Sequence, residues 1–201
     1  AALLGALSTR RAGTPLAMIT LGLGELVYAA AQMFPAWSGG DAGVSANRVL
    51  GAPWGGWSFG PAGQVYALVA VYTLASTAAL YALTRTPFGL ALRAVRDHAT
   101  RAAFLGYDPR AVRYRAFLVA GFFAGLAGGL AALHLERVGT EALGAARSGA
   151  YLLFTFVGGV SVFWGPILGA LLMVLALGAW VALSPAWELY LGLLFVAMVI
   201  A

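Results

Sequence analysis

The chain of 201 residues contains no cysteine and no lysine, because all twelve of its cationic residues are arginine. Without cysteine, these residues cannot form disulfides, thiolate metal sites or cysteine nucleophiles. Without lysine, they cannot supply the ammonium group of a Walker A loop, a Schiff base or a lysine general base. We therefore expect no catalytic residue, metal or cofactor here, and any coupled nucleotide hydrolysis must take place on another subunit.

Charge of either sign is also scarce. Only 9% of the residues are charged and 62% are hydrophobic, whereas a soluble domain has about 25% charged and about 45 to 50% apolar residues. Apolar runs of the roughly 20 residues that a helix needs to cross about 30 Å of hydrocarbon recur along the chain. The composition predicts an all-α fold, a polytopic bundle of transmembrane helices, with residues 1–201 forming one domain.

The predicted spans that lie wholly inside the sequence cover 12–34, 62–83 and 116–135, and another is predicted to start near Trp187. Since apolar runs are interrupted at both ends of the sequence, we expect the chain to be part of a longer protein, truncated at both ends. The segment 35–61 between the first two spans is predicted to be an ordered external loop. It is rich in proline and glycine, and it carries the interface-favouring Trp37, Trp54 and Trp57.

The apolar stretch 149–183 is too long for one upright span and is interrupted by Gly158-Gly159 and Gly165-Pro166. One interpretation is two elements with a break near Trp164. The other is a re-entrant or half-length helix over 149–163, which requires protein to cover its free backbone groups. The sequence does not choose between them.

The segment 84–115 carries seven arginines against two acidic residues, a balance of +5 that equals the net charge of the whole chain. Because cytoplasmic loops of membrane proteins are enriched in arginine and lysine, this loop is predicted to lie in the cytoplasm. Arg10 and Arg11 then lie on the same side, and 35–61 lies outside. The predicted location is the inner (plasma) membrane, as a multi-pass protein.

Within this loop the sequence predicts one helix over 87–105. Thr86 is a suitable N-cap before Pro87, and Gly106 is a suitable stop. Asp108 and Pro109 then form the cap and first residue of the third span, which therefore begins in the cytoplasm. The apolar residues of the loop helix recur at three- and four-residue steps, with arginines on the other faces. Such a helix either rests on anionic membrane lipid or docks against a partner protein.

Glu25 lies midway along the first span, where an ionisable group costs at least about 2.5 to 3.5 kcal/mol on insertion scales. It must therefore face protein or water. Either it lines the translocation path of a solute, or it is hydrogen-bonded to a neighbouring helix, for example to Tyr72 or Thr73. The step from Gly121 to Gly125 predicts close packing of the third span against another helix.

Several stretches resemble one family in the same order. Residues 86–97 (TPFGLALRAVRD) and 101–107 (RAAFLGY) look like the cytoplasmic loop of the high-affinity branched-chain amino acid ABC importer permeases. Further agreement is found at 20–25 (TLGLGE), at 39–43 (GGDAG) and at 158–159 followed by 164–170 (WGPILGA). Each stretch alone is weak, but the ordered set covers most of the chain and is fairly specific.

The resemblance implies a permease subunit that works with a second permease subunit, two cytoplasmic ATP-binding subunits and an extracytoplasmic solute-binding protein. It implies contact with membrane lipid and none with nucleic acid. The solute would be a branched-chain or other hydrophobic amino acid. The loop helix would be the coupling helix, in which small residues allow close approach to the ATPase. The residues that the resemblance assigns to ATPase coupling are Phe88, Gly89, Arg93, Arg96, Asp97, Ala102, Ala103 and Gly106.

Three alternatives remain open at this point. A permease of the same family that imports urea or an amide has the same features. A secondary transporter explains Glu25 but not the arginine-rich loop, and a structural membrane anchor explains neither.

Overall fold

The computed structural model describes residues 2–40, 43–45 and 60–183, and it divides into two compact units, 1–142 and 143–201. The expectation of a single domain stays a prediction. The last predicted span, near Trp187, lies outside the described residues, as do Trp54 and Trp57.

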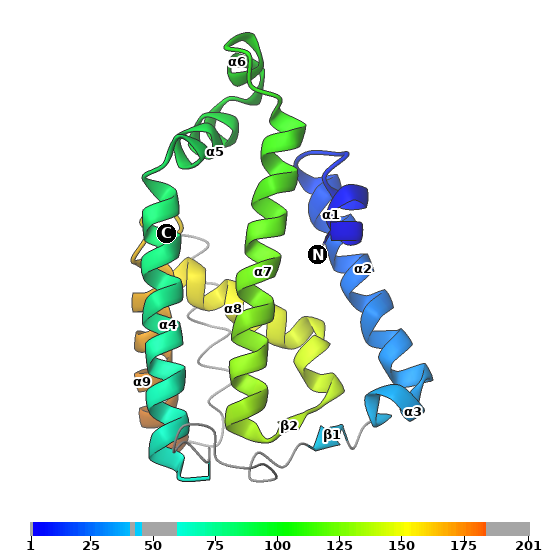
Figure 1. Ribbon diagram of the computed structural model, residues 1–201, viewed down its shortest axis with the longest axis vertical. Helices are drawn as coiled ribbons and strands as arrows, with labels where there is room; N and C mark the ends of the chain where they lie inside the picture. The colour runs from blue at the N-terminus through cyan, green and yellow to red at the C-terminus, as the bar shows by residue number, and fades with distance from the viewer. Residues whose placement is uncertain (1, 41–42, 46–59, 184–201) are drawn as a thin grey trace. The chain divides into compact units, whose positions relative to one another are not determined.

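Three long helices dominate the first unit: α2 (Thr14–Met33), α4 (Ala62–Thr84) and α7 (Pro109–Leu135). In the described part of the chain these three helices are long and apolar enough to cross a membrane, which confirms the three predicted spans. They alternate in direction, so that the segment 85–108 and the turn after Ser8 lie at one end and the connections after Met33 and Leu135 at the other (Figure 1).

Local chemistry fixes where these helices begin. Asp108 caps α7 by accepting a hydrogen bond from the backbone N–H of Arg110 at 2.9 Å, and Pro109 occupies the first turn. Because proline has a preset φ and lacks the N–H group that the first turn cannot use, this position suits it. The predicted start of the third span at Pro109 is confirmed. Gly13 directly precedes α2 and has φ 74°. Glycine adopts this positive φ without steric cost, which allows the sharp turn into the helix.

The opposite end of this unit is closed by a short strand pair. After α3 (Pro35–Ser38), β1 (Val44–Ser45) pairs antiparallel with β2 (Arg137–Val138), which follows α7. Gly43 has φ 70°, and a methyl group there would lie 2.6 Å from the Val138 carbonyl oxygen, so only glycine fits. The pair ties together two connections that are far apart in the sequence (Figure 1).

The short helix α1 (Ala2–Ser8) packs on α7. A methyl group on Gly5 would lie 2.7 Å from Cδ1 of Phe117, so the absence of a side chain at Gly5 allows the ring to lie against the backbone of α1. The hydroxyl of Tyr114 also reaches the Ala2 carbonyl oxygen at 3.5 Å. The N-terminal half of α7 therefore holds the turn that leads into α2.

The second unit is a hairpin of α8 (Ala145–Gly158) and α9 (Gly165–Leu183), preceded by the 3-10 turn η2 (Thr140–Leu143). The predicted break near Trp164 is confirmed. The 14 residues of α8 rise about 21 Å, less than the roughly 30 Å of a full span, and whether this segment is re-entrant stays a prediction. A methyl group on Gly169 would overlap the Phe154 carbonyl oxygen, and methyl groups on Gly158 and Gly165 would overlap backbone of the facing segment.

A methyl group on Gly125 would meet open space, so no described helix of the first unit packs closely there; close packing at this step against another helix stays a prediction. Gly-x-x-x-Gly spacing marks a face on which helices can approach closely, but the spacing alone does not say which helix is near. In this chain the close approach falls instead at Gly165 and Gly169, which lie against α8.

The contact between α8 and α9 can be tested with two glycine-to-alanine substitutions on α9, one inside the contact and one outside it. We expect Gly169→Ala to destabilise the protein by about 1 to 3 kcal/mol, because the backbones must separate to admit the methyl group. We expect Gly178→Ala to be neutral or stabilising by about 0.5 to 1 kcal/mol, because nothing lies within 4 Å of that position and alanine favours the helix. Thermal unfolding of the two full-length variants in detergent measures the difference, and equal melting temperatures would contradict the packing described.

Candidate functional site

The arginine-rich loop folds as a packed unit with its own small core. Its helices are α5 (Pro87–Asp97) and α6 (Ala99–Phe104), and both pack against the first turns of α7. Ala91 and Val95 from α5, Ala102 from α6 and Val112 from α7 are all buried and in contact, and we call them the loop core. Apolar burial therefore holds α5 and α6 to the start of α7.

The first helix of the loop is also tied to the end of α4. The Thr86 hydroxyl accepts a hydrogen bond from the Gly89 N–H at 3.5 Å, which confirms the predicted N-cap. A methyl group on Gly89 would lie 2.8 Å from the Leu83 carbonyl oxygen and overlap that of Thr84. Arg93 reaches back to donate to the Thr84 carbonyl oxygen at 2.7 Å, where α4 leaves carbonyl groups without helical partners.

The predicted single helix over 87–105 is wrong, because the chain is extended at His98 (φ −148°, ψ 92°). The His98 N–H closes α5 on the Ala94 carbonyl, and the His98 carbonyl accepts the first bond of α6 from Ala102. The physical reason is packing in the loop core. The break allows Ala102 to turn inward against Val112, whereas Leu105, which the continuous pattern placed on the apolar face, turns outward.

Exposed apolar side chains gather where the loop turns back toward α7. Phe104 is 93% exposed and Leu105 is 72% exposed, and the ring of Tyr107 is also exposed; we call these three residues the loop apex. Gly106, with φ 89°, makes the turn between them and confirms the predicted helix stop. In Figure 1, α6 is at the tip of the unit, beyond the end of α4. An exposed phenylalanine next to an exposed leucine is typical of a contact surface.

Apart from Gly106 at the turn, the structure separates the residues that the resemblance assigned to ATPase coupling into two groups. Ala102, 1% exposed, and Gly89 are inside the loop, and Arg93 is bonded to α4, so these three shape the loop. Ala103 is exposed beside the loop apex, and Phe88 is half-buried. Arg96 and Asp97 form an exposed ion pair at 3.0 Å. Their roles in coupling stay predictions.

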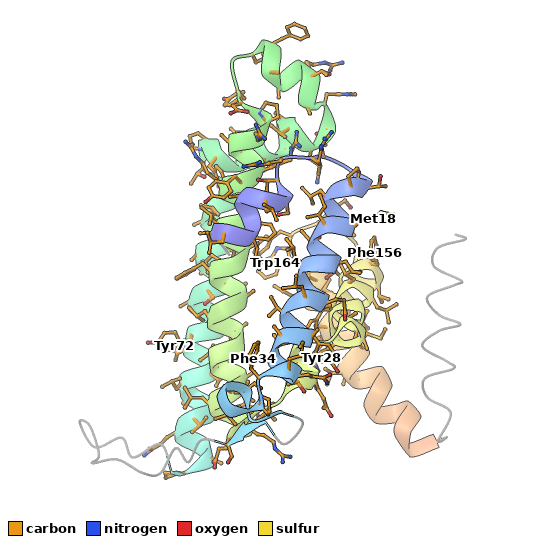
Figure 2. All side chains as sticks on the ribbon, turned by 90° about the vertical axis from the view of Figure 1, so that its right-hand side faces the viewer. Met18, Tyr28, Phe34, Tyr72, Phe156 and Trp164 are labelled. Carbon is orange, nitrogen blue, oxygen red and sulfur yellow. The ribbon has the colours of Figure 1, made fainter. Side chains whose placement is uncertain are left out.

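Glu25 is half-buried on α2 and has no hydrogen bond or ion pair with any described residue. The hydrogen bond to Tyr72 or Thr73 that the sequence left open is not formed among these residues. The Tyr72 ring is exposed and points away from α2 (Figure 2). The carboxylate is therefore left for water, a partner or a solute, and its role stays a prediction.

A cavity of about 390 Å³ lies between α4 and α7. Its wall is apolar except for the hydroxyls of Thr73, Ser76 and Thr77 and the ring of His134 at one end, where His134 meets Tyr66 edge to face at 6.4 Å. Apolar walls with a few hydroxyls suit an apolar solute.

All 201 residues match the family described as the permease component of the branched-chain amino acid transport system. The chain belongs to this permease family. The high-affinity branched-chain amino acid transport system permease protein LivM of Escherichia coli K12 is 30% identical over 195 residues, covering 87% of this chain and 46% of the relative. LivM of Salmonella typhimurium LT2 gives the same identity and coverage. This permease chain thus spans about half the length of the curated relatives it matches, and no solved structure matches it.

Sequence reasoning missed the loop apex of the permease. The pattern extended a helix through His98, and this placed Leu105 on the buried face and left Phe104 without a role. The signal available was the pairing of Phe104 and Leu105 directly before Gly106. Bulky apolar residues that adjoin a turn at the end of a short helix are seldom both buried by it.

The neighbouring residues Ala102 and Ala103 differ in burial, because only Ala102 is part of the loop core. We expect Ala102→Leu to destabilise the loop by about 1 to 3 kcal/mol, because its site is full, and Ala103→Leu to be nearly silent, because its side chain is exposed. Limited trypsin digestion of the full-length permease in inside-out vesicles reports the opening of the loop at Arg93, Arg96 and Arg101. Cleavage should rise about tenfold or more in the first variant only. Equal rates in both variants would mean that Ala102 is not enclosed.

Proposed function

We propose that this chain is the membrane-spanning part of a permease subunit in an ABC importer of branched-chain or other hydrophobic amino acids, driven by ATP hydrolysis on separate subunits. It would work in the inner membrane with a second permease subunit, two cytoplasmic ATP-binding subunits and an extracytoplasmic solute-binding protein. Both the family and the relatives are described by branched-chain amino acid transport, which favours these solutes over urea or an amide. The observation that carries the proposal is the packed loop with its exposed apolar apex.

The position of the loop apex favours a protein partner over lipid. At about 1.5 Å per residue, the stretch of α7 from Pro109 to Ala116 spans about 10 Å. The apolar run of α7 begins at Ala116, and the polar headgroup layer beyond the hydrocarbon is only about 6 Å thick on each side. Phe104 and Leu105, which precede Pro109, therefore lie outside the acyl chains, where exposed aromatic and leucine side chains are covered only by another protein.

The charge and packing of the loop support a cytoplasmic ATPase as that partner. The loop carries a balance of +5, which favours a cytoplasmic position, and the loop core joins it to α7. A force applied by an ATPase at the loop apex would therefore reach a membrane span through packed side chains. The opposite end, closed by the strand pair of β1 and β2, would face the solute-binding protein.

The loop apex can be tested without disturbing the fold. We expect Phe104→Ser and Leu105→Ser each to weaken binding of the ATP-binding subunit about tenfold or more, as loss of a buried interface anchor does. Because both side chains are exposed, the permease itself should keep its stability within about 0.5 kcal/mol. Copurification and ATP hydrolysis stimulated by loaded binding protein are the measurements, made on the complete transporter.

The control for this experiment is Leu135→Ser, a leucine that is 60% exposed at the other end of α7. It should leave copurification and stimulated hydrolysis unchanged. If Phe104→Ser and Leu105→Ser both copurified ATPase normally and kept full stimulation, the loop apex would not be the dock and the coupling assignment would fail.

Glu25 is proposed to line the translocation path. We expect Glu25→Gln to reduce uptake of labelled leucine about tenfold, the value of a charge-assisted hydrogen bond to a solute or its water, with normal assembly of the transporter. Glu141→Gln, the same change at an exposed residue of η2, should leave uptake unaltered. Near-normal uptake by Glu25→Gln would contradict a role in the translocation path and leave the carboxyl a structural role.

A further inference from the structure

A second cluster of charge lies away from the loop apex, where α1 meets α7. A cavity of about 540 Å³ there is lined by Thr9 and Arg10 from the turn after α1 and by Asp108, Arg110 and Tyr114 from the start of α7. The two arginines are a hundred positions apart in the sequence. The packing of Gly5 under Phe117 is what brings their backbones to one site.

The polar groups of this cavity are available for an anion. Neither Arg10 nor Arg110 has an ion-pair partner among the described residues. The Tyr114 hydroxyl is held only by a long bond of 3.5 Å to the Ala2 carbonyl oxygen, so it is free to donate elsewhere. Thr9 donates to the Gly5 carbonyl oxygen at 2.7 Å and supplies no further proton. Asp108 opposes an anion, but its carboxylate is already bonded to the Arg110 N–H, and the cavity keeps a balance of one positive charge.

At about 1.5 Å per residue, Tyr114 lies about 3 Å before the apolar run of α7, at the depth of lipid headgroups. The backbone of Arg110 lies about 9 Å before that run, and its long side chain can reach back to the headgroup layer. Arg10 precedes the apolar run of α2, and Arg110 and Tyr114 precede the apolar run of α7 that begins at Ala116. Tyrosine favours this layer of the membrane, and basic pockets between helices on the cytoplasmic side bind anionic headgroups. Beside the cavity, Leu3 is 88% exposed and Leu7 is also exposed on α1, which gives acyl chains an apolar surface next to the charged groups.

We propose that this cavity binds a phosphate group, and that the phosphate is the phosphodiester of an anionic lipid, held by the guanidinium groups of Arg10 and Arg110 and by the hydroxyl of Tyr114. Guanidinium groups recognise phosphate oxygens through paired N–H donors. Such a lipid bridges α1 and α7 and stabilises the turn that enters α2. The site would bind lipid whether or not the chain transports amino acids.

The experiment uses the full-length permease in its complete transporter, purified in detergent and equilibrated with phosphatidylglycerol. A wash at about 1 M salt, where charges are screened beyond about 3 Å, removes lipid held by delocalised attraction. Native mass spectrometry then counts the phosphatidylglycerol that remains. We expect Arg10→Gln combined with Arg110→Gln to weaken retention about 25-fold, about fivefold for each arginine.

The chain offers a matched control, because Arg11 and Arg115 are exposed neighbours on the same elements that do not line the cavity. Arg11→Gln combined with Arg115→Gln changes the charge equally and should alter retention by less than about twofold at this salt. If both double variants lost phosphatidylglycerol retention equally, or if neither lost any, the proposal of a discrete site would be overturned.

Two further arms separate the sources of phosphate and exclude misfolding. Asp108→Asn keeps a residue suited to capping α7 but removes the opposing charge, so it should raise phosphatidylglycerol retention by about two- to fivefold, a gain that misfolding cannot produce. Millimolar inorganic phosphate should not displace the lipid. Displacement by inorganic phosphate, or equal retention of phosphatidylcholine, would overturn the assignment to an anionic lipid.

Discussion

Val112, in the first turns of α7, packs against Ala91, Val95 and Ala102, and this contact determines how the end of the first unit that carries the arginine-rich loop is built. Since Asp108 starts α7 well before its apolar run, the helix extends past the membrane and offers the loop a surface to pack on. The loop core is small, but it spans three helices, so that α5 and α6 cannot shift without displacing α7. Transmission of force from a cytoplasmic partner to a membrane span requires such a contact, because a flexible linker would absorb the movement.

Glycines set which helices of this chain can meet. Gly89 allows α5 to fold onto the end of α4, Gly5 allows α1 to lie under Phe117, and Gly169 allows α9 to approach α8. By contrast, a methyl group on Gly22 or Gly125 would meet open space. Gly22 and Gly125 therefore leave faces without side chains on α2 and α7. Such faces are available to lipid or to another subunit.

The parts of the fold that could be predicted from the sequence depend on local chemistry. The spans follow from the length of the apolar runs. The caps at Thr86 and Asp108 follow from side chains that accept hydrogen bonds from backbone N–H groups. The stop at Gly106 follows from the ability of glycine to adopt a positive φ. The break at His98 could not be predicted, because no proline or glycine marks it and its cause is the burial of Ala102 against a residue of another helix. The sequence indicated 84–115 as the candidate segment, and its role stays a prediction; the exposed and buried members of that segment could be separated only once the break was known.

Arginine serves two purposes in this chain, and the sequence shows only one of them. As charge, the seven arginines of 84–115 are equivalent and indicate the cytoplasmic side. In the structure they differ: Arg93 bonds the end of α4, Arg85 lies 4.8 Å above the Tyr81 ring and bonds its hydroxyl, and Arg96 pairs with Asp97. A planar guanidinium can stack on a ring and donate in several directions at once, whereas an ammonium group is a compact point charge. Lysine at these positions would preserve the topology signal but lose the contacts to the Tyr81 ring and the paired donors, so arginine here contributes structure as well as charge.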